Sequence, residues 1–318
     1  MRSLITGIGG FAGSHLADLL IAQGEVVQGT VREPSHTNLV EHLLGRSQVE
    51  IHPIDIRDRK GMTDLLRDER FDRIYHLAGV TFIPESVESP EETLDVNLRG
   101  TLSLFEAVRA AAPTARVLYV SSAAAYGDID DPSRPVEEAT PFRPINPYGF
   151  TKAAGDLMAY QYVRQHGLDI VRGRPFNHTG PRQAPMFVCS EFAKAVAEME
   201  EGRRPPEITV GNLDIGRDFT DVRDIVRGYV LLLDRGRTGR SYNLASGRAT
   251  KVREILNHLI ALAKTEIHII EDPRKFRAGE VLSIIGSAEK AAREIDWRPD
   301  IPLERTLGDL LDWWRERI

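Results

Sequence analysis

The first part of the chain alternates short apolar runs with segments of helical periodicity. The apolar runs predict strands at residues 3–6, 26–31, 49–54, 73–77, 117–121 and 169–172. Helical patterns fall between them, at residues 13–22, 62–68, 97–111 and 148–166. This alternation predicts right-handed crossovers and an α/β fold, a doubly wound parallel sheet covered by helices on both faces.

The rhythm changes after Arg174, where prolines begin to separate short segments. We interpret the change as the start of a smaller α/β substrate-binding domain, formed by residues 178–217 and 247–318. The first domain comprises residues 1–177, and residues 218–246 return to it through a helix at 221–233 and a strand at 241–244. The last helix is predicted at residues 303–317.

Composition restricts the possible partners. The 318 residues are 42% hydrophobic, enough for real cores, and the net charge of -6 with scattered basic residues gives no footprint for nucleic acid or an anionic membrane. The single cysteine, Cys189, excludes an internal disulfide framework, and the nine histidines show no ligand spacing, so we expect no metal. No signal peptide or apolar span is evident, and we expect a cytoplasmic protein.

Candidate chemistry starts with Tyr148 and Lys152, four residues apart and therefore on one face of the predicted helix. A lysine ammonium beside a tyrosine favours the phenolate and lowers the phenol pKa from its ordinary value of about 10. Ser122 follows a predicted strand and adds a hydroxyl donor for the same substrate oxygen. The three residues suit hydride transfer at a carbonyl, although many surface helices carry such a tyrosine and lysine.

A glycine-rich turn joins the first predicted strand to the first helix. Gly7, Gly10 and Gly13 are spaced as GxxGxxG, which lets pyrophosphate oxygens reach the N–H groups at a helix N-terminus. At this first strand-to-helix junction the pattern favours a dinucleotide site over an ordinary glycine turn, and the fold is then Rossmann-type.

The end of the second strand indicates which dinucleotide binds. Residues 29–32 contain no acid that would bond the ribose hydroxyls, and Arg32 can pair with a 2′-phosphate, so we favour NADP over NAD. The alternative is that Arg32 is only a solvated loop residue. Asp55 can contact the adenine or cap the helix that begins near Asp58. We expect His76 to be a buried, hydrogen-bonded histidine.

These features together resemble the extended short-chain dehydrogenase/reductase family over essentially the whole chain. The resemblance implies that Ser122, Tyr148 and Lys152 act on a nucleotide-sugar with the nicotinamide on the same face. It also implies a homodimer formed through the helices at 97–111 and 148–166. The predicted cofactor site comprises Gly7, Gly10, Phe11, Gly13, Arg32, Asp55, Ile56, Leu77, Ala78, Gly79, Asn97, Tyr148 and Lys152.

Segments of the second domain narrow the resemblance. Residues 174–181, 210–213, 217–222 and 277–281 look like those of the branch that contains GDP-mannose 4,6-dehydratases and GDP-4-dehydro-6-deoxy-mannose reductases. The resemblance implies a GDP-sugar substrate, with its diphosphate clamped by two arginines, its ribose bonded by a glutamate, and an asparagine that touches substrate or holds backbone. The predicted substrate residues are Asn177, Val188, Arg217, Arg277 and Glu280.

Ala124 separates the members of this branch. At this position the dehydratases carry a glutamate for proton transfer, and the epimerase-reductases carry a cysteine; a methyl group transfers no proton. We expect Cys189 to be a small buried residue and His178 to be tied to backbone, so neither replaces the missing group.

What remains is reduction of the C4 ketone of GDP-4-dehydro-6-deoxy-D-mannose by NADPH, which gives GDP-D-rhamnose. The alternatives are a nucleotide-sugar 4-epimerase with retained NAD, a GDP-mannose 4,6-dehydratase, and an inactive NADP sensor on the same fold. The stereochemistry at C4 is not predicted, and the opposite hydride face would give the 6-deoxytalose product.

Overall fold

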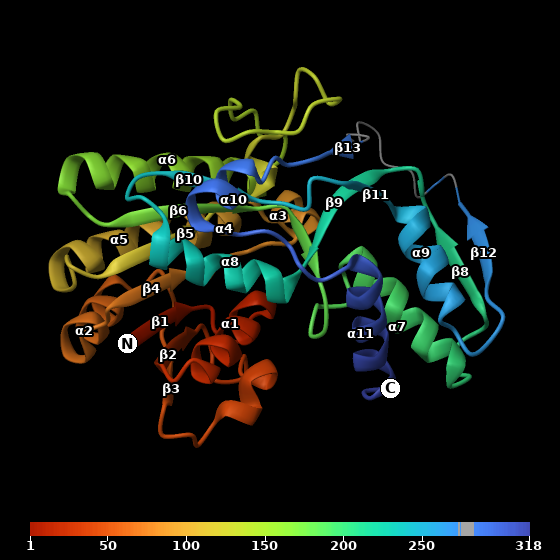
Figure 1. Cartoon of the computed structure of the whole chain (residues 1–318). Helices are drawn as coiled ribbons and strands as arrows, with labels where there is room; N and C mark the ends of the chain where they lie inside the picture. Colours follow the sequence, from red (N-terminus) through yellow and green to blue (C-terminus); the bar gives the residue numbers. More distant parts are fainter. Residues whose placement is uncertain (273, 275–282) are drawn as a thin grey trace.

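A seven-stranded parallel sheet forms the centre of the molecule (Figure 1). The structure is a computed structural model that describes residues 1–272, 274 and 283–318. Within that part of the chain the strand order is β10-β6-β5-β4-β1-β2-β3, and all neighbours are parallel. The strands are β1 Arg2–Thr6, β2 Val26–Val31, β3 Val49–Pro53, β4 Arg73–His76, β5 Arg116–Val120, β6 Ile170–Pro175 and β10 Ser241–Leu244.

The strand order reverses between β1 and β4, and this reversal positions the site. Chain connections leave β1 and β4 toward opposite faces there, so a crevice opens beyond the carboxyl ends of these strands. The glycine turn follows β1 at Gly7, and Leu77 follows β4 at the same edge. The fold therefore brings two predicted cofactor segments, 70 residues apart in the sequence, to one edge of the sheet.

Helices cover both faces of the sheet because consecutive strand residues point in opposite directions. In β1, Leu4 packs into a core with α2 and α5, and Ile5 packs into the other core with α1 and α8. Both residues are fully buried, as expected for a parallel sheet with both faces covered. The covering helices are α1 Phe11–Ala22, α2 Arg59–Glu69, α5 Gly100–Ala111, α6 Pro147–His166, α8 Val222–Arg235 and α10 Glu289–Ile295.

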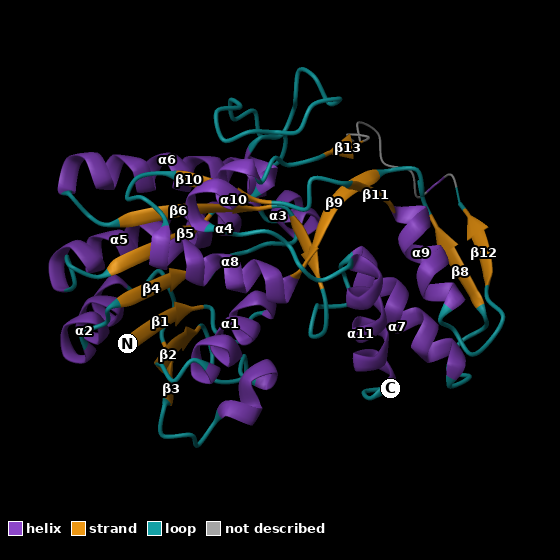
Figure 2. Ribbon diagram, viewed as in Figure 1, coloured by secondary structure: helices purple, strands orange, loops and turns teal. Residues whose placement is uncertain are grey.

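A smaller lobe lies beyond one end of the sheet (Figure 2). Its helices α7, α9 and α11 share a separate core, and its strands form two small sheets, β11-β9-β13 with β7 beside β9, and β12-β8. The helices are α7 Val188–Glu200, α9 Val252–Ala261 and α11 Leu303–Arg315. The strands are β7 Asn177–Thr179, β8 Glu207–Val210, β9 Gly216–Asp221, β11 Ala249–Lys251, β12 His268–Glu271 and β13 Ser283–Ile284.

The predicted α/β class and doubly wound sheet are confirmed, including the return of residues 241–244 to the sheet as β10. Several short elements were not predicted, because each is too short to show periodicity. They are the 3-10 helices η1 Asn38–Leu43 and η3 Ala123–Ala125 and the helices α3 Ile83–Glu88 and α4 Pro90–Leu94. The helix predicted from residue 97 starts with a π-helical turn at Asp95–Arg99. Among the described helices, none combines the length and apolarity needed to cross a membrane.

Candidate functional site

Helix α6 carries Tyr148 in its first turn. Asn146 caps the helix by accepting a hydrogen bond from the Gly149 N–H at 2.8 Å, and Pro147 occupies the first helical position. Lys152 follows one turn later, with its Nζ 5.9 Å from the centre of the Tyr148 ring. The cap fixes where the helix starts and so sets the direction of both side chains.

Lys152 is buried between α6 and the end of β5. Its Nζ donates to the Val120 carbonyl at 2.9 Å, and the Ser121 hydroxyl donates to the Lys152 carbonyl at 3.2 Å. Burial disfavours the ammonium and lowers the pKa of Lys152 from 10.5 to about 8. A site lysine that titrates near neutral pH makes the chemistry sensitive to mildly alkaline conditions.

Ser122 stands beside the Tyr148 hydroxyl. Its Oγ accepts from the Ala124 N–H at 3.1 Å, which caps η3, and a hydrogen bond joins it to Tyr148. Burial raises the pKa of Tyr148 above its ordinary value, and the bond with Ser122 only partly offsets this. The expectation that the pKa of Tyr148 lies below its ordinary value is therefore wrong here, because burial outweighs the groups that favour the phenolate. A protonated Tyr148 is the form that a reduction requires.

The glycine turn leaves no space for side chains where the chain crosses the sheet edge. Gly7 has a φ of 75°, and a Cβ on it would lie 2.9 Å from the Ala78 Cα. A Cβ on Gly13 would lie 2.3 Å from the Gly7 carbonyl oxygen. Gly10 is the N-cap of α1, with no side-chain cap and no acid in the first turn. These uncapped N–H groups fit a cofactor pyrophosphate.

Replacing Gly13 by alanine is expected to weaken NADPH binding at least about 10-fold, because the new methyl group displaces the Gly7 carbonyl and with it the turn. Fluorescence titration with NADPH measures the loss. Gly308→Ala in α11 is the matched control, since its Cβ meets nothing closer than 3.9 Å. Equal NADPH affinity in Gly13→Ala and the control would contradict this role for the turn.

The residues predicted for the adenosine end follow β2 and β3. Arg32 is exposed, and its Nε lies 3.7 Å from Glu33. Asp55 accepts from the Arg57 Nε at 2.9 Å and Nη2 at 2.7 Å, and this arginine lowers the pKa of Asp55. The interpretation of Asp55 as a helix cap is wrong, because Asp58 caps α2 by accepting from the Gly61 N–H at 3.0 Å.

Asn97 connects the loop after β4 to the catalytic helix. Its Oδ1 accepts from the Val80 N–H at 2.8 Å, and its Nδ2 donates to the Val80 carbonyl and to the Thr151 Oγ1, both at 3.0 Å. The residue lies in the π-helical turn, which breaks the regular register of side chains before α5. The side chain thereby fixes Gly79, whose missing Cβ would lie 2.7 Å from the Asn97 Oδ1.

Two further residues near this edge are structural. His76 is buried between the hydroxyls of Thr6 and Thr101, at 2.8 and 2.9 Å, and burial lowers its pKa to about 3. The interpretation of His76 as a buried, bonded histidine is confirmed. The Ile56 side chain packs in the core against α5, so only its backbone can meet a cofactor.

Three of the five predicted substrate residues are described, and they lie on the smaller lobe. Asn177 and Arg217 are on the neighbouring strands β7 and β9, where Asn177 pairs with Phe219. The Asn177 Nδ2 donates to the Asp218 carbonyl at 3.3 Å, and the Arg217 Nη1 donates to the Gly216 carbonyl at 2.8 Å. Val188 begins α7. Arg277 and Glu280 lie outside the described residues.

Asp218 organises this lobe, although it was not predicted. Its buried carboxylate accepts from the Ser246 N–H and Oγ at 2.7 and 2.6 Å and from the N–H groups of Gly247 and Gly286 at 3.0 and 3.1 Å. Burial raises its pKa despite these bonds. The only signal in the sequence is an acid inside the strand beside Arg217, and its partners are remote in sequence.

Known proteins of one family match this chain over almost its whole length. The family described as GDP-mannose 4,6 dehydratase matches residues 4–310. The chain belongs to this family. It is 33% identical over 317 residues to a GDP-6-deoxy-D-mannose reductase of Pseudomonas aeruginosa, covering 100% of this chain and 98% of the relative. It is 28% identical to a GDP-mannose 4,6-dehydratase of Vibrio cholerae, covering 98% and 92%.

Solved structures show the same fold. The structure of RMD from Pseudomonas aeruginosa complexed with NADPH has a TM-score of 0.87 at 32% identity and covers 100% of this chain and 99% of its own. A UDP-glucose 4-epimerase of Thermus thermophilus in complex with NAD has a TM-score of 0.87 at 27% identity, covering 100% of both chains. The Rossmann-type expectation is confirmed.

This family includes dehydratases, which need a second group for proton transfer. The groups near Ser122 that can transfer a proton therefore distinguish a dehydratase site from a reductase site. Residues Ala123–Ala125 form η3 and contribute only methyl groups there. Burial raises the pKa of Cys189 to about 12, and the His178 ring bonds the Phe176 carbonyl at 3.1 Å. The expectations that Cys189 is a small buried residue and that His178 is tied to backbone are confirmed.

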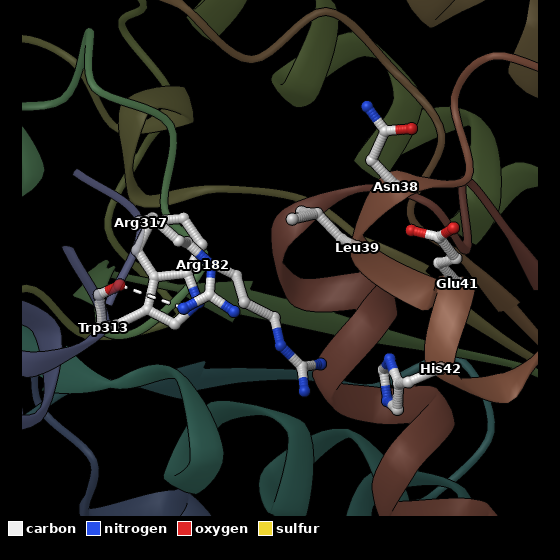
Figure 3. Close-up of a pocket in the computed structure, with 7 residues that line it drawn as sticks. All are labelled: Asn38, Leu39, Glu41, His42, Arg182, Trp313 and Arg317. Carbon is white, nitrogen blue, oxygen red and sulfur yellow. Dashed lines mark hydrogen bonds between the residues drawn. The ribbon is translucent and has the colours of Figure 1, made fainter. Parts of the chain in front are cut away.

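A separate cavity of about 490 Å³ lies between the sheet domain and the end of α11 (Figure 3). On the sheet-domain side of this cavity, the Asp18 carboxylate lies 2.7 Å from the His42 Nε2 and 2.7 Å from the Arg182 Nη1. No predicted site residue lines it, so we do not assign catalysis to it. The lining residues are Asn38, Leu39, Glu41, His42, Arg182, Trp313 and Arg317.

Proposed function

We propose that this chain is an NADPH-dependent oxidoreductase that reduces the C4 ketone of GDP-4-dehydro-6-deoxy-D-mannose to GDP-D-rhamnose. The observation that carries the proposal is the grouping of Ser122, Tyr148 and Lys152 beside a loop with alanine at position 124. Ketone reduction needs one proton donor, whereas dehydration needs a second group to remove a proton and release water. The full-length similarity to a GDP-6-deoxy-D-mannose reductase supports the same choice.

The chain's residues supply the proton and hold the developing charge. NADPH, when bound, supplies the hydride that reduces C4. The Tyr148 hydroxyl donates its proton to the C4 oxygen as the carbonyl becomes an alcohol. Ser122 bonds this hydroxyl and supports the same oxygen, and the Lys152 ammonium stabilises the phenolate left on Tyr148.

The proposed cofactor site uses the glycine turn for the pyrophosphate and Arg32 for the 2′-phosphate. The turn fits because side chains are absent where the backbone must approach the phosphates. Asp55, the Ile56 backbone, residues 77–79 and Asn97 would line the nucleoside and nicotinamide ends. NADPH in the Pseudomonas structure supports the preference for NADP over NAD.

The proposed substrate site lies between the two lobes. Residues 1–177 with 218–246 would form most of the NADP-binding domain, and residues 178–217 with 247–318 most of the sugar-nucleotide domain. The strands β7 and β9 belong to the smaller lobe, however, and α10 packs on the central sheet. Arg217 and Arg277 would hold the diphosphate, and Glu280 would hold the ribose. Asn177 and Val188 would complete this side. We place the reaction in the cytoplasm, with its product used for surface polysaccharide.

One experiment tests the proposed reaction. The protein is incubated with GDP-mannose, a separate 4,6-dehydratase and NADPH, and the product is identified by NMR. GDP-D-rhamnose is expected, with NADPH consumed only when the dehydratase is present. Formation of the 6-deoxytalose epimer would overturn the stereochemistry, and conversion of GDP-mannose without the dehydratase would overturn the argument from Ala124.

A nucleotide-sugar 4-epimerase is the second candidate. The similarity to UDP-glucose 4-epimerase structures favours it, as does the fact that such a reaction needs only the same serine, tyrosine and lysine. Tightly retained NAD in the purified protein, with interconversion of UDP-galactose and UDP-glucose, would support this function and exclude the reductase.

We also propose a homodimer formed through α5 and α6. Phe150, Leu157 and Tyr160 are 50%, 59% and 46% exposed, and their spacing places them along one side of α6. Leu157→Glu is expected to yield monomers in light scattering, because it puts a charge into the apolar contact. Leu262→Glu, at an exposed position at the end of α9, is the control and should leave the dimer intact.

A further inference from the structure

A buried ionic network lies behind the catalytic residues. Asp156 is one helical turn beyond Lys152 on α6, and its side chain is fully buried. It accepts from the Arg172 Nη1 at 2.5 Å and from the Arg174 Nε and Nη2, both at 2.9 Å. Two guanidinium groups on one carboxylate fix the rotation of α6 relative to β6, where both arginines lie.

The network continues to the loop that carries Ser122. The Arg174 Nη1 donates to the Tyr126 Oη and to the Glu138 carbonyl, both at 2.9 Å. The Tyr126 hydroxyl then donates to the Asn243 Oδ1 on β10 at 2.7 Å. Ser122 is the N-cap of η3 and Tyr126 is its C-cap. The network therefore contacts the helix that carries Tyr148 and Lys152 as well as the short helix that carries Ser122.

The contact between the two elements is tight at backbone level as well. A Cβ on Gly149 would lie 2.4 Å from the Ala124 carbonyl oxygen, so α6 and η3 touch directly next to Tyr148. With such close packing, a small rotation of η3 would move the Ser122 hydroxyl away from Tyr148. Hydrogen bonds can fix this rotation because they are directional, and the Tyr126 hydroxyl makes two of them.

We propose that Tyr126 is a positioning residue, which acts through Arg174 and Asp156 to hold Ser122 in register with Tyr148. This inference rests on the proposed reductase function. Tyr126 is buried beneath the loop, with its hydroxyl occupied by Arg174 and Asn243, and it touches no reacting atom. Its contribution is geometric, and misplacement of about 1 Å can cost a reaction 10²-fold.

The test is Tyr126→Phe, which removes the hydroxyl and keeps the ring against Phe142 and Phe176. We expect kcat for the 4-keto sugar to fall about 10-fold, with KM for sugar and NADPH little changed. Tyr162→Phe is the matched control, since its hydroxyl donates to Glu106 at 2.8 Å, in a contact between α6 and α5. An unchanged kcat in Tyr126→Phe would overturn the proposal.

A double-mutant cycle with Ser122→Ala separates positioning from general stability. If Tyr126 acts through Ser122, Tyr126→Phe has no further effect on kcat once the Ser122 hydroxyl is gone. Independent, multiplicative losses would overturn the proposal. Asn243→Leu removes one of the two hydrogen bonds of the Tyr126 hydroxyl, together with the bond from the Asn243 Nδ2 to the Val136 carbonyl. It should reproduce part of the loss in kcat, which keeps the test valid if Tyr126→Phe folds poorly. Absence of turnover by the unmodified protein would instead reject the reductase function.

Discussion

Tyr148→Phe is expected to lower kcat by about 10²–10⁴-fold, the usual contribution of a positioned proton donor. The change removes one oxygen and leaves the ring in place on α6, 5.9 Å from the Lys152 Nζ. No other side chain of η3 replaces the donor, because residues Ala123–Ala125 carry only methyl groups. The rate is measured as NADPH consumption with the 4-keto sugar.

The binding measurements distinguish this effect from damage to the fold. NADPH affinity of Tyr148→Phe should change far less than kcat, because the ring stays in place and the missing hydroxyl acts chiefly on the C4 oxygen in the transition state. Tyr160→Phe on the same helix is the control, since Tyr160 lies twelve residues beyond Tyr148 and its side chain is 46% exposed. A Tyr148→Phe variant that retained most of its kcat would show that another group protonates the alkoxide.

The features predicted correctly from sequence are those set by neighbours along the chain. The glycine turn and the four-residue spacing of Tyr148 and Lys152 depend on local backbone geometry, which residue type and spacing determine. The position of Ala124 is equally local, because it lies two residues after Ser122 in one short helix. Positions that rest on such spacing need no knowledge of the tertiary fold, whereas the roles of these residues stay predictions.

The features missed depend on partners that are remote in the sequence. The pKa of Tyr148 was expected to lie below its ordinary value, but burial raises it, and the Lys152 Nζ also donates to the Val120 carbonyl, 32 residues away. The four donors to Asp218 come from residues 28, 29 and 68 positions away. Periodicity contains no information on such contacts, because they depend on how strands and loops meet at the sheet edge.

Activity in the direction of reduction is expected to fall above about pH 8, because Lys152 loses its proton there. The direction of this change follows from the charge of Lys152. Below its pKa the lysine is an ammonium that stabilises the Tyr148 phenolate, and above its pKa this charge is lost. Tyr148 does not titrate in this range, since burial raises its pKa above the ordinary value of 10.0. The limb in the pH profile of kcat/KM therefore belongs to Lys152.

Unfolding does not explain a loss of activity in this range. The unfolded chain holds the Lys152 proton up to a pKa of 10.5, whereas the folded chain releases it near 8, so the contribution of Lys152 to stability rises with pH between these values. Lys152→Met should lower kcat/KM on the order of 10²-fold at pH 7 and abolish the alkaline limb. A limb that survived in Lys152→Met would assign the titration to another group, and the same variant with unchanged activity would remove Lys152 from the catalytic arrangement.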